Sequence, residues 1–448
     1  MSGIRSTISY RRGFFNKKIL LLIIIISFVM NPVCAPTTGT ADANKEFSDI
    51  RSNDWFYPTV MKLVNSGAIS GFPDRTFRPN SPITRAEFVK VLIDALKMPI
   101  KKGYYYTDTK DHWASDYIST AIVKGIVSEN AANDVFMPDQ SINRLDMTRM
   151  MLSALKVESV EDESPFVDIS DEAATSAFSE CLVMGSMDNG NRYFFPYEDA
   201  TRAEVSAVII RAVEYKKNPE AYKKKELYDM LVKPSAVMAT VTNNTKLYSN
   251  CSLSSKAIGA LEAGTKVEII YGISAKWFNI STGNKTGWIQ RSALYIPADP
   301  PTNISRMTAE QMEGYVNYKG FKSNSPYFVW VDIDRQITNV FLGTQGKWKL
   351  NKTMECSTGK NETPSIRGLF TISQRGKSFY NPTYGSGAKY WVRYNNDYLF
   401  HSIAFDKYGN IKDPTLGKRA STGCIRMSVE DSSWFYNYIP KDTAVWVF

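Results

Sequence analysis

The sequence predicts a multidomain protein in which helical repeats precede a small all-β module and a larger, mainly β C-terminal domain. Three observations support this order. Residues 47–216 contain an internal threefold repeat of 58–60 residues. Short apolar segments separated by Gly, Asn and Ser follow in 237–296, and longer strand-like segments follow in 326–448. The length of 448 residues also agrees with about three domains.

The first 41 residues indicate a secretory signal. Residues 1–18 carry five cations and no acid, and a 12-residue apolar run from Ile19 to Met30 follows. Since a membrane-spanning helix needs roughly 20 residues, we favour a signal peptide over the alternative of an uncleaved anchor. Cleavage after Ala41 or Ala43 predicts a secreted protein without a stable membrane anchor.

Charge and cysteine content limit the classes of function. The formal net charge of +9 becomes +4 when the five cations of the signal are removed. A mildly basic secreted protein suits an anionic polymer, whereas the absence of a basic stripe argues against nucleic-acid binding. Five scattered cysteines without a CxxC pair, with only two histidines, predict no structural disulfide, no metal site and no cofactor.

The three repeats share aligned acidic and basic positions. Each opens on an aromatic residue with an aspartate two positions later, and each has an arginine six residues after the proline of a Phe-x-Pro motif. The aspartates and arginines are Asp49, Asp108, Asp168, Arg85, Arg144 and Arg202. An N-cap candidate precedes each arginine, and an acid lies three residues after the cap, as in a capping box. Because a cation at a helix start opposes the macrodipole, we expect each arginine to pair with an acid or an anion.

Two of these motifs, Ile83-Thr84-Arg85-Ala86-Glu87 and Ala200-Thr201-Arg202-Ala203-Glu204, resemble the S-layer homology domain, and Asn143-Arg144-Leu145-Asp146 is a looser match. We therefore expect three such helical repeats, at 47–105, 106–165 and 166–216. The resemblance implies anchoring to anionic secondary cell-wall polysaccharide, in grooves formed by the three arginines and the three opening aspartates. The third copy lacks the tryptophan of the first two, which leaves its groove in doubt.

Residues 237–296 predict a small β module with strands at Val267–Ile270, Trp277–Ile280 and Gly287–Ile289. Lys246–Ser249, together with Gly264-Thr265 and the last of these strands, resembles a bacterial SH3-like domain. This resemblance implies binding of wall peptides or glycans. A spacer role is equally open, because a fold does not fix a function. A lysine-rich helical connector at 217–235 precedes the module.

The C-terminal region combines predicted strands with a candidate nucleophile. The strands are expected at Tyr327 to Ile333, Gln336 to Leu342, Gly368 to Ile372, Lys389 to Tyr394 and Tyr398 to Phe405. Cys424 follows a turn of small residues, and His401 lies 23 positions upstream. These are the components of a cysteine nucleophile and its base. We expect the imidazole to raise the thiolate fraction, which is about 3% for a free thiol at neutral pH.

His401-Ser402 and Ser421-Thr422-Gly423-Cys424-Ile425-Arg426 resemble the active-site motif of the L,D-transpeptidase catalytic domain, over about residues 326–448. The family implies a mainly β domain, a β-sandwich with short helices. It also implies that Cys424 attacks a peptidoglycan stem tetrapeptide, that His401 is the base, and that the Ser402 carbonyl orients it. Thr422 stands where the family usually has a second histidine.

Further roles follow from the same resemblance. The N–H groups of Gly423 and Cys424 would bind the oxyanion, and Ser421, Thr422 and Arg426 would contact the substrate. Transfer of the thioester to a neighbouring stem would give a 3→3 cross-link. Two alternatives remain: an L,D-carboxypeptidase that gives the thioester to water, and a non-catalytic wall-binding protein. Lys360 and Arg367 are candidates for lining the cleft, but we favour their interpretation as solvated loop charges.

Overall fold

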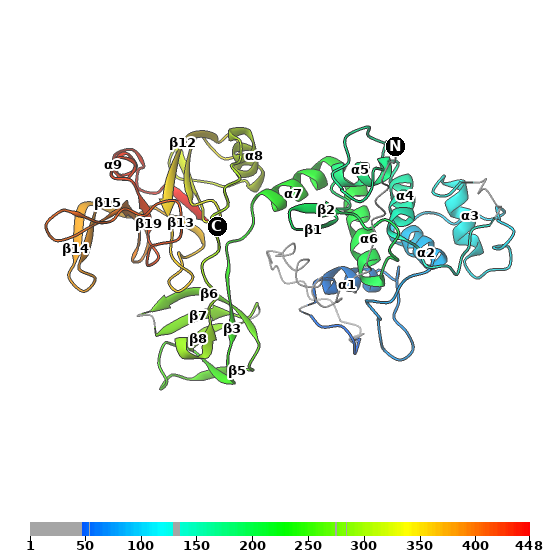
Figure 1. Ribbon diagram of the computed structural model, residues 1–448, viewed down its shortest axis with the longest axis horizontal. Helices are drawn as coiled ribbons and strands as arrows, with labels where there is room; N and C mark the ends of the chain where they lie inside the picture. Colours follow the sequence, from blue (N-terminus) through cyan, green and yellow to red (C-terminus); the bar gives the residue numbers. More distant parts are fainter. Residues whose placement is uncertain (1–46, 53, 129–134, 274–275, 284) are drawn as a thin grey trace, which may run out of the picture. The chain divides into compact units, whose positions relative to one another are not determined.

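The computed structural model describes residues 47–52, 54–128, 135–273, 276–283 and 285–448 (Figure 1). The predicted signal peptide at 1–41 lies outside these described residues. The described residues divide into two compact units, with the boundary between Met230 and Leu231. In the described ranges, no helix has the length and apolar character needed to cross a membrane.

The first unit is mainly helical, as its repeats predict. Its elements are α1 (Tyr57–Asn65), α2 (Arg85–Ala95), α3 (Ser115–Val123), α4 (Arg144–Leu155), α5 (Glu172–Ser179), β1 (Ser186–Asp188), β2 (Asn191–Tyr193), α6 (Arg202–Lys217) and α7 (Pro219–Leu231). The long helix α6 contacts α1, α2 and α4 (Figure 1). One continuous apolar core joins the three repeats, with Phe77, Phe88 and Phe194 fully buried in it.

Two of the three predicted capping boxes are complete. The hydroxyls of Thr84 and Thr201 accept the N–H of the residue three positions on. The carboxylates of Glu87 and Glu204 in turn accept the backbone N–H of the cap residue. At the start of α4, the Asn143 side chain accepts the N–H of Asp146, but no reciprocal bond forms. The Asp146 side chain is one methylene shorter than glutamate, and it instead pairs with an arginine of the preceding repeat.

Backbone hydrogen bonds close the three repeats into a cycle. The N–H at the first position of α2, α4 and α6 donates to a carbonyl of another repeat, at Gln140, Glu198 and Ser81 respectively, over 2.9–3.0 Å. The third repeat thus bonds back to the first. Each helix start has N–H groups that need partners outside the helix, and here the next repeat supplies them. This geometry supports the proposal that 166–216 is a third repeat.

The β module of the second unit is a seven-stranded antiparallel sheet. Its strands are β3 (Val237–Val241), β4 (Thr245–Tyr248), β5 (Ala257–Leu261), β6 (Lys266–Ile273), β7 (Trp277–Ser281), β8 (Thr286–Gln290) and β9 (Leu294–Tyr295), with η3 (Arg291–Ala293) before the last. The order is β5-β4-β8-β7-β6-β3-β9. The three predicted strands lie within β6, β7 and β8. Phe278, Ile280 and Ile289 point into the module's own core. Its assignment as SH3-like remains a proposal.

The C-terminal domain is an eleven-stranded sheet with two helices. Its elements are α8 (Ala309–Lys319), β10 (Tyr327–Asp332), β11 (Ile337–Leu342), β12 (Lys349–Ser357), β13 (Gly368–Thr371), β14 (Gln374–Asn381), β15 (Ser386–Asn395), β16 (Tyr398–Ser402), β17 (Ala404–Phe405), β18 (Ile411–Asp413), β19 (Ile425–Met427), α9 (Val429–Tyr438) and β20 (Ala444–Val447). Four of the five predicted strands each correspond to a single strand, and the fifth, Tyr398 to Phe405, is divided into β16 and β17. The sequence patterns did not reveal the other strands.

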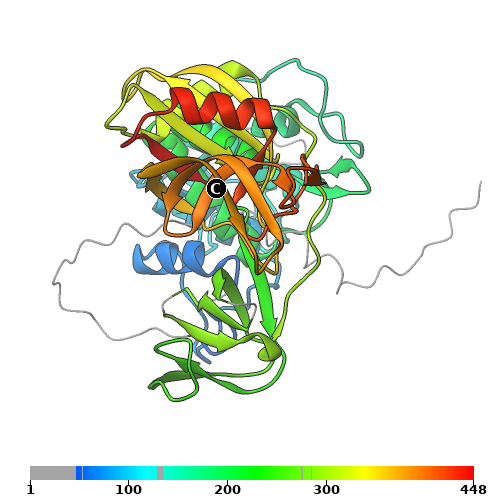
Figure 2. The ribbon, with the colours of Figure 1, turned by 90° about the vertical axis from the view of Figure 1, so that its left-hand side faces the viewer.

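The strand order of this sheet positions the candidate site. The path is β13-β20-β10-β11-β12-β19-β16-β15-β17-β18, and β14 pairs with β15. Helix α9 packs on β15 and β16 (Figure 2), where Phe435 stacks on Phe400 with 4.4 Å between ring centroids. This core holds β16 and β19 in a fixed register. Strand β16 carries His401, and β19 begins directly after Cys424.

Candidate active site

The candidate nucleophile and base lie on neighbouring parallel strands. The pairing of β16 with β19 sets Phe400 opposite Ile425 and His401 opposite Arg426. Cys424 directly precedes β19, and a bond from the Leu399 N–H reaches its sulfur. Leu399 lies two residues before His401 on β16. The sheet therefore brings the thiol close to the strand that carries His401.

His401 is held as a neutral base with a defined tautomer. Its ring is buried, and Nδ1 lies 2.6 Å from the Ser402 carbonyl oxygen. A carbonyl only accepts hydrogen bonds, so Nδ1 must carry the proton. Burial, with a contribution from the Arg426 charge, lowers the pKa of His401 to about 4. At neutral pH the other ring nitrogen, Nε2, is therefore an unprotonated acceptor.

The Cys424 thiol is less acidic than the sequence predicts. Burial raises its pKa to about 11, although a bond from the Leu399 N–H acts in the opposite direction. The sulfur lies 3.7 Å from the Asp397 carbonyl oxygen, to which the thiol donates. Desolvation of the sulfur outweighs the neighbouring donors, and it opposes the increased thiolate fraction that the sequence predicts. The resting pair is a thiol and a neutral imidazole.

The turn before Cys424 requires glycine. Gly423 has φ +118°, and a Cβ at this position would lie 2.8 Å from the ring of Tyr398. The Ser421 hydroxyl accepts the Gly423 N–H at 3.1 Å and donates to the Cys424 carbonyl at 2.6 Å. Since the Gly423 N–H is already bonded, the Cys424 N–H is the better candidate for the oxyanion donor.

The predicted substrate contacts have different environments. Thr422 is exposed beside the nucleophile, whereas Ser421 is buried. The Arg426 guanidinium forms an ion pair with Asp413 of β18. Burial opposes the ionisation of Asp413, but hydrogen bonds from Thr415 and Arg426 lower the pKa of its carboxyl to about 2. Much of the charge on Arg426 is thus already compensated within the protein.

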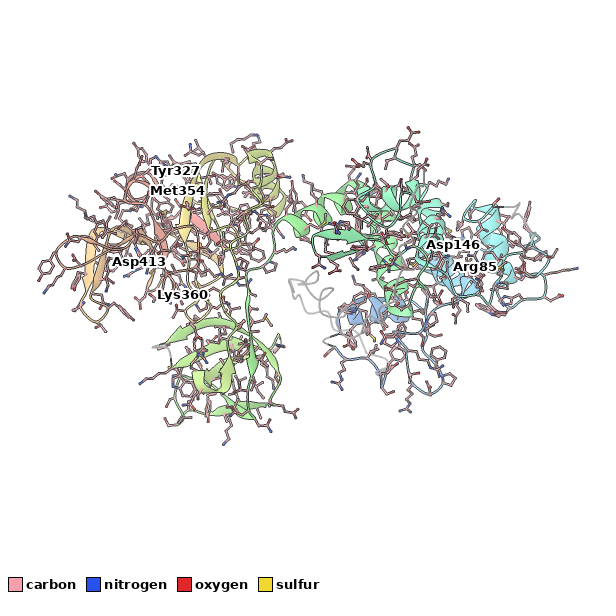
Figure 3. All side chains as sticks on the ribbon, viewed as in Figure 1. Arg85, Asp146, Tyr327, Met354, Lys360 and Asp413 are labelled. Atoms are coloured by element: carbon pink, nitrogen blue, oxygen red, sulfur yellow. The ribbon has the colours of Figure 1, made fainter. Side chains whose placement is uncertain are left out.

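Two of the repeat arginines pair with acids as expected. Arg85 donates to the Phe136 carbonyl at 2.9 Å and to Asp146 at 2.7 Å (Figure 3). Arg144 makes the equivalent bonds, to Phe194 and Glu204. Each arginine thus reaches into the following repeat. A cavity of about 220 Å³ lies at the first of these junctions, and its lining includes Arg85, Tyr106, Phe136, Asp146 and Arg149.

Arg202 differs from the other two. It closes the cycle by donating to the carbonyls of Phe77 and Ser70, at 2.9 and 2.8 Å, and it is only 5% exposed. Among the described residues no carboxylate lies within ion-pair distance of its guanidinium. Burial lowers the pKa of Arg202. The arginine pairs with a carboxylate at two of the three junctions between repeats, and bonds only to backbone carbonyls at the third.

The opening aspartates have a structural role in every repeat. Each carboxylate accepts two consecutive backbone N–H groups of the Phe-x-Pro segment, at distances of 2.6–2.9 Å. The second donor is a non-glycine residue with positive φ: Arg78, Met137 and Phe195. Such backbone is costly without support, and Asp49, Asp108 and Asp168 provide that support. All three aspartates remain exposed, and their contact with a wall polymer stays a prediction.

Several residues around the site were not identified from the sequence. Arg367 was expected to be a solvated loop charge, but it forms an ion pair with Glu268 of the β module, so that expectation is wrong. Ser365, Tyr398 and Asp413 touch the nucleophile turn or Arg426. None of them has a spacing that marks it, because each reaches the site through the tertiary fold.

Comparison with known families supports two of the predicted domain types. Residues 326–447 match the L,D-transpeptidase catalytic domain, and residues 46–89 and 105–148 match the S-layer homology domain. The chain is 32% identical over 126 residues to the putative L,D-transpeptidase YciB of Bacillus subtilis, covering 26% of this chain and 64% of that protein. It is 27% identical over 252 residues to S-layer protein EA1 of Bacillus anthracis, covering 54% and 28%.

An endoglucanase from Bacillus sp. (strain KSM-635) is 29% identical over 209 residues, covering 43% of this chain and 22% of the enzyme. The chain thus spans about a quarter of the length of these two longer relatives. A solved L,D-transpeptidase from Mycobacterium smegmatis matches with 16% identity and a TM-score of 0.23, covering 39% of this chain and 68% of that one. This score is too low to add to the comparison. Residues 326–447 form an L,D-transpeptidase-like catalytic domain, and two S-layer homology domains precede it.

Proposed function

We propose that this protein is a secreted, wall-anchored L,D-transpeptidase that forms 3→3 cross-links in peptidoglycan. The observation that carries the proposal is the arrangement of His401 and Cys424. The bond from Nδ1 to the Ser402 carbonyl leaves Nε2 as an acceptor, and the Leu399 N–H, two residues before His401 on β16, bonds to the Cys424 sulfur. A base that can take the thiol proton is what a cysteine nucleophile needs.

The proposed acylation begins as the thiol proton moves to Nε2 of His401. The sulfur attacks the carbonyl between the third and fourth residues of the donor stem, and the Cys424 N–H stabilises the oxyanion. Collapse of this intermediate breaks the peptide bond, and the imidazolium gives its proton to the departing amine of D-Ala. A thioester on Cys424 and a neutral imidazole remain.

The second half-reaction returns the enzyme to its starting state. The amine of a neighbouring stem attacks the thioester while His401 takes the proton that this amine loses. The C–S bond breaks, and the imidazolium reprotonates the thiolate. Water in place of the amine would give hydrolysis, so the balance between transpeptidation and carboxypeptidation depends on which acceptor reaches the thioester.

The first unit is proposed to hold the enzyme on anionic secondary cell-wall polysaccharide. This proposal extends the two matched S-layer homology domains to a third at 166–216, and includes Arg85, Arg144, Arg202 and the opening aspartates among the binding residues. The cavity between the first two repeats contains the Arg85 side chain, which is 18% exposed. A partly exposed guanidinium at a junction is a suitable site for an acidic sugar substituent.

Loss of the two paired arginines tests the anchoring proposal. Changing Arg85 and Arg144 together to Met should release the protein from isolated cell walls in a sedimentation assay. The matched control is Lys62→Met, which removes an exposed ion pair to Glu214 in the same unit. Full retention of the double variant would contradict the groove assignment, provided circular dichroism shows that it is folded.

Product analysis tests the enzymatic proposal. The protein is incubated with purified disaccharide-tetrapeptide, with Cys424→Ala as the control, and the products are followed by mass spectrometry. Dimers lighter by one D-Ala than two monomers are the expected result. Tripeptide monomers alone would favour the L,D-carboxypeptidase alternative. If the substrate shows no Cys424-dependent change, the result would favour a non-catalytic wall-binding protein.

A further inference from the structure

The nucleophile turn, residues 421–424, is held by one loop of the catalytic domain. We name residues 359–367 the bridging loop. Its Ser365 hydroxyl donates to the Gly423 carbonyl at 2.7 Å and accepts the Gly359 N–H at 2.9 Å. Two further bonds, from the Lys360 N–H and the Thr363 hydroxyl, reach the Ser421 carbonyl at 3.1 and 3.2 Å. These bonds attach the turn to the loop, in addition to the bonds that the Ser421 hydroxyl makes within the turn.

The bond from Ser365 has a direct consequence for catalysis. The Gly423 carbonyl and the Cys424 N–H belong to the same planar peptide unit and point in opposite directions. Fixing the carbonyl oxygen on the Ser365 hydroxyl therefore fixes the direction of the Cys424 N–H, the candidate oxyanion donor. Gly423 at φ +118° would otherwise leave this peptide free to rotate.

The other side of the bridging loop is attached to the β module. Glu362 accepts two bonds from the Arg291 guanidinium, at 2.8 and 2.6 Å, and Arg367 pairs with Glu268 of β6. Directly before Glu362, the buried Asn361 is held by the linker that leaves the module. Its N–H donates to Asp299 at 2.6 Å, and its side-chain amide donates to two linker carbonyls. One short loop thus contacts both the module and the nucleophile turn.

We propose that the β module positions the oxyanion donor of Cys424 through the bridging loop. This inference rests on the proposed function of Cys424 and assigns Ser365, Glu362 and Arg291 as positioning residues. It gives the module a role in the reaction itself, beyond that of a spacer or a wall-binding domain. The arginine–glutamate pair is partly exposed, at 35% and 51%, and such pairs contribute little to folding. Its loss should therefore disturb the loop without unfolding the domain.

Two reagents separate positioning from general damage. A carbapenem acylates a thiol through a tetrahedral oxyanion, whereas iodoacetamide alkylates the same thiol without forming one. We expect Ser365→Ala in the full-length chain to lower the carbapenem acylation rate of Cys424 about 10- to 100-fold. This effect is somewhat smaller than that of removing an oxyanion donor itself in other enzymes. The iodoacetamide rate should stay within about twofold. Both rates are read by mass spectrometry of the peptide that contains Cys424.

The module contact is tested by charge reversal and rescue. Glu362→Lys places like charges at Arg291 and should lower the acylation rate, and adding Arg291→Glu should restore it. Glu313→Gln is the matched control, since it weakens a pair with the exposed Lys349 elsewhere on the catalytic domain. Its acylation rate should equal that of the unmodified protein.

The possible results differ in what they reject. Unchanged acylation in Ser365→Ala and Glu362→Lys would overturn the inference while leaving the proposed function in place. An equal fall in acylation and alkylation would also overturn it, because the loop would then be structural only. If the unmodified protein is neither acylated by the carbapenem nor active on stem peptides, the proposed function itself fails, and the inference fails with it.

Discussion

The high pKa of the Cys424 thiol gives a quantitative prediction about its reactivity. Burial raises this pKa to about 11, compared with about 8.5 for a free cysteine. At pH 8 the thiolate fraction is then about 0.1% instead of about 24%, a ratio of roughly 240. Each thiolate is more nucleophilic because its pKa is higher, which recovers about tenfold. Cys424 should therefore react with a small disulfide about 20-fold more slowly than a free cysteine peptide.

The assay is thiol–disulfide exchange with a pyridyl disulfide reagent, measured from pH 7 to 10. Peptide mapping assigns the label to each cysteine, and Cys424→Ala gives the background from Cys181, Cys251 and Cys356. The rate at Cys424 should rise about tenfold for each pH unit over the whole range. It should show no plateau below pH 10.

A different profile would refute the reasoning about the resting state. A rate equal to or faster than the free peptide at pH 8, with a plateau beginning below pH 8.5, would mean that the thiol is held as a thiolate. The pair would then be a thiolate and an imidazolium, and proton transfer to Nε2 of His401 would precede substrate binding.

Three further predictions concern stability. Gly423→Ala should destabilise the C-terminal domain by about 1–3 kcal/mol in urea unfolding, since a Cβ strains the backbone and meets Tyr398. The folded-state pKa of His401 is below its ordinary 6.5, so the unfolded state binds a proton first as the pH falls. About 3 kcal/mol of folding stability should therefore be lost between pH 6.5 and pH 4. The His401→Gln variant should lack this pH-dependent loss. Asp168→Asn leaves one backbone N–H of its turn unpaired and should cost the first unit about 1–2 kcal/mol in thermal unfolding.

Local rules predicted the elements that depend on neighbouring residues. The caps at Thr84 and Thr201 are both present, each with the reciprocal bond of a capping box. Strands with strong alternation or apolar runs were also found. These features are encoded over a few residues, so the sequence is sufficient to identify them.

Contacts between distant residues could not be predicted in the same way. The acid that pairs with Arg85 comes from the next repeat, 61 positions along the chain, and the module's partner for Arg367 lies 99 positions before it. The thiol pKa depends on how completely the surrounding fold removes water, which no spacing reports. The parallel pairing of β16 and β19 joins segments that only the complete sheet brings together.

The most direct test of the central claim is to trap the acyl-enzyme. The protein is mixed with disaccharide-tetrapeptide, quenched in acid within seconds, digested and examined by mass spectrometry. We predict a tripeptide acyl group on the peptide that contains Cys424, absent from Cys424→Ala and greatly reduced in His401→Gln. Cross-linked product that forms without any adduct at Cys424, or an adduct at a different residue, would contradict the claim that this thiol carries the reaction.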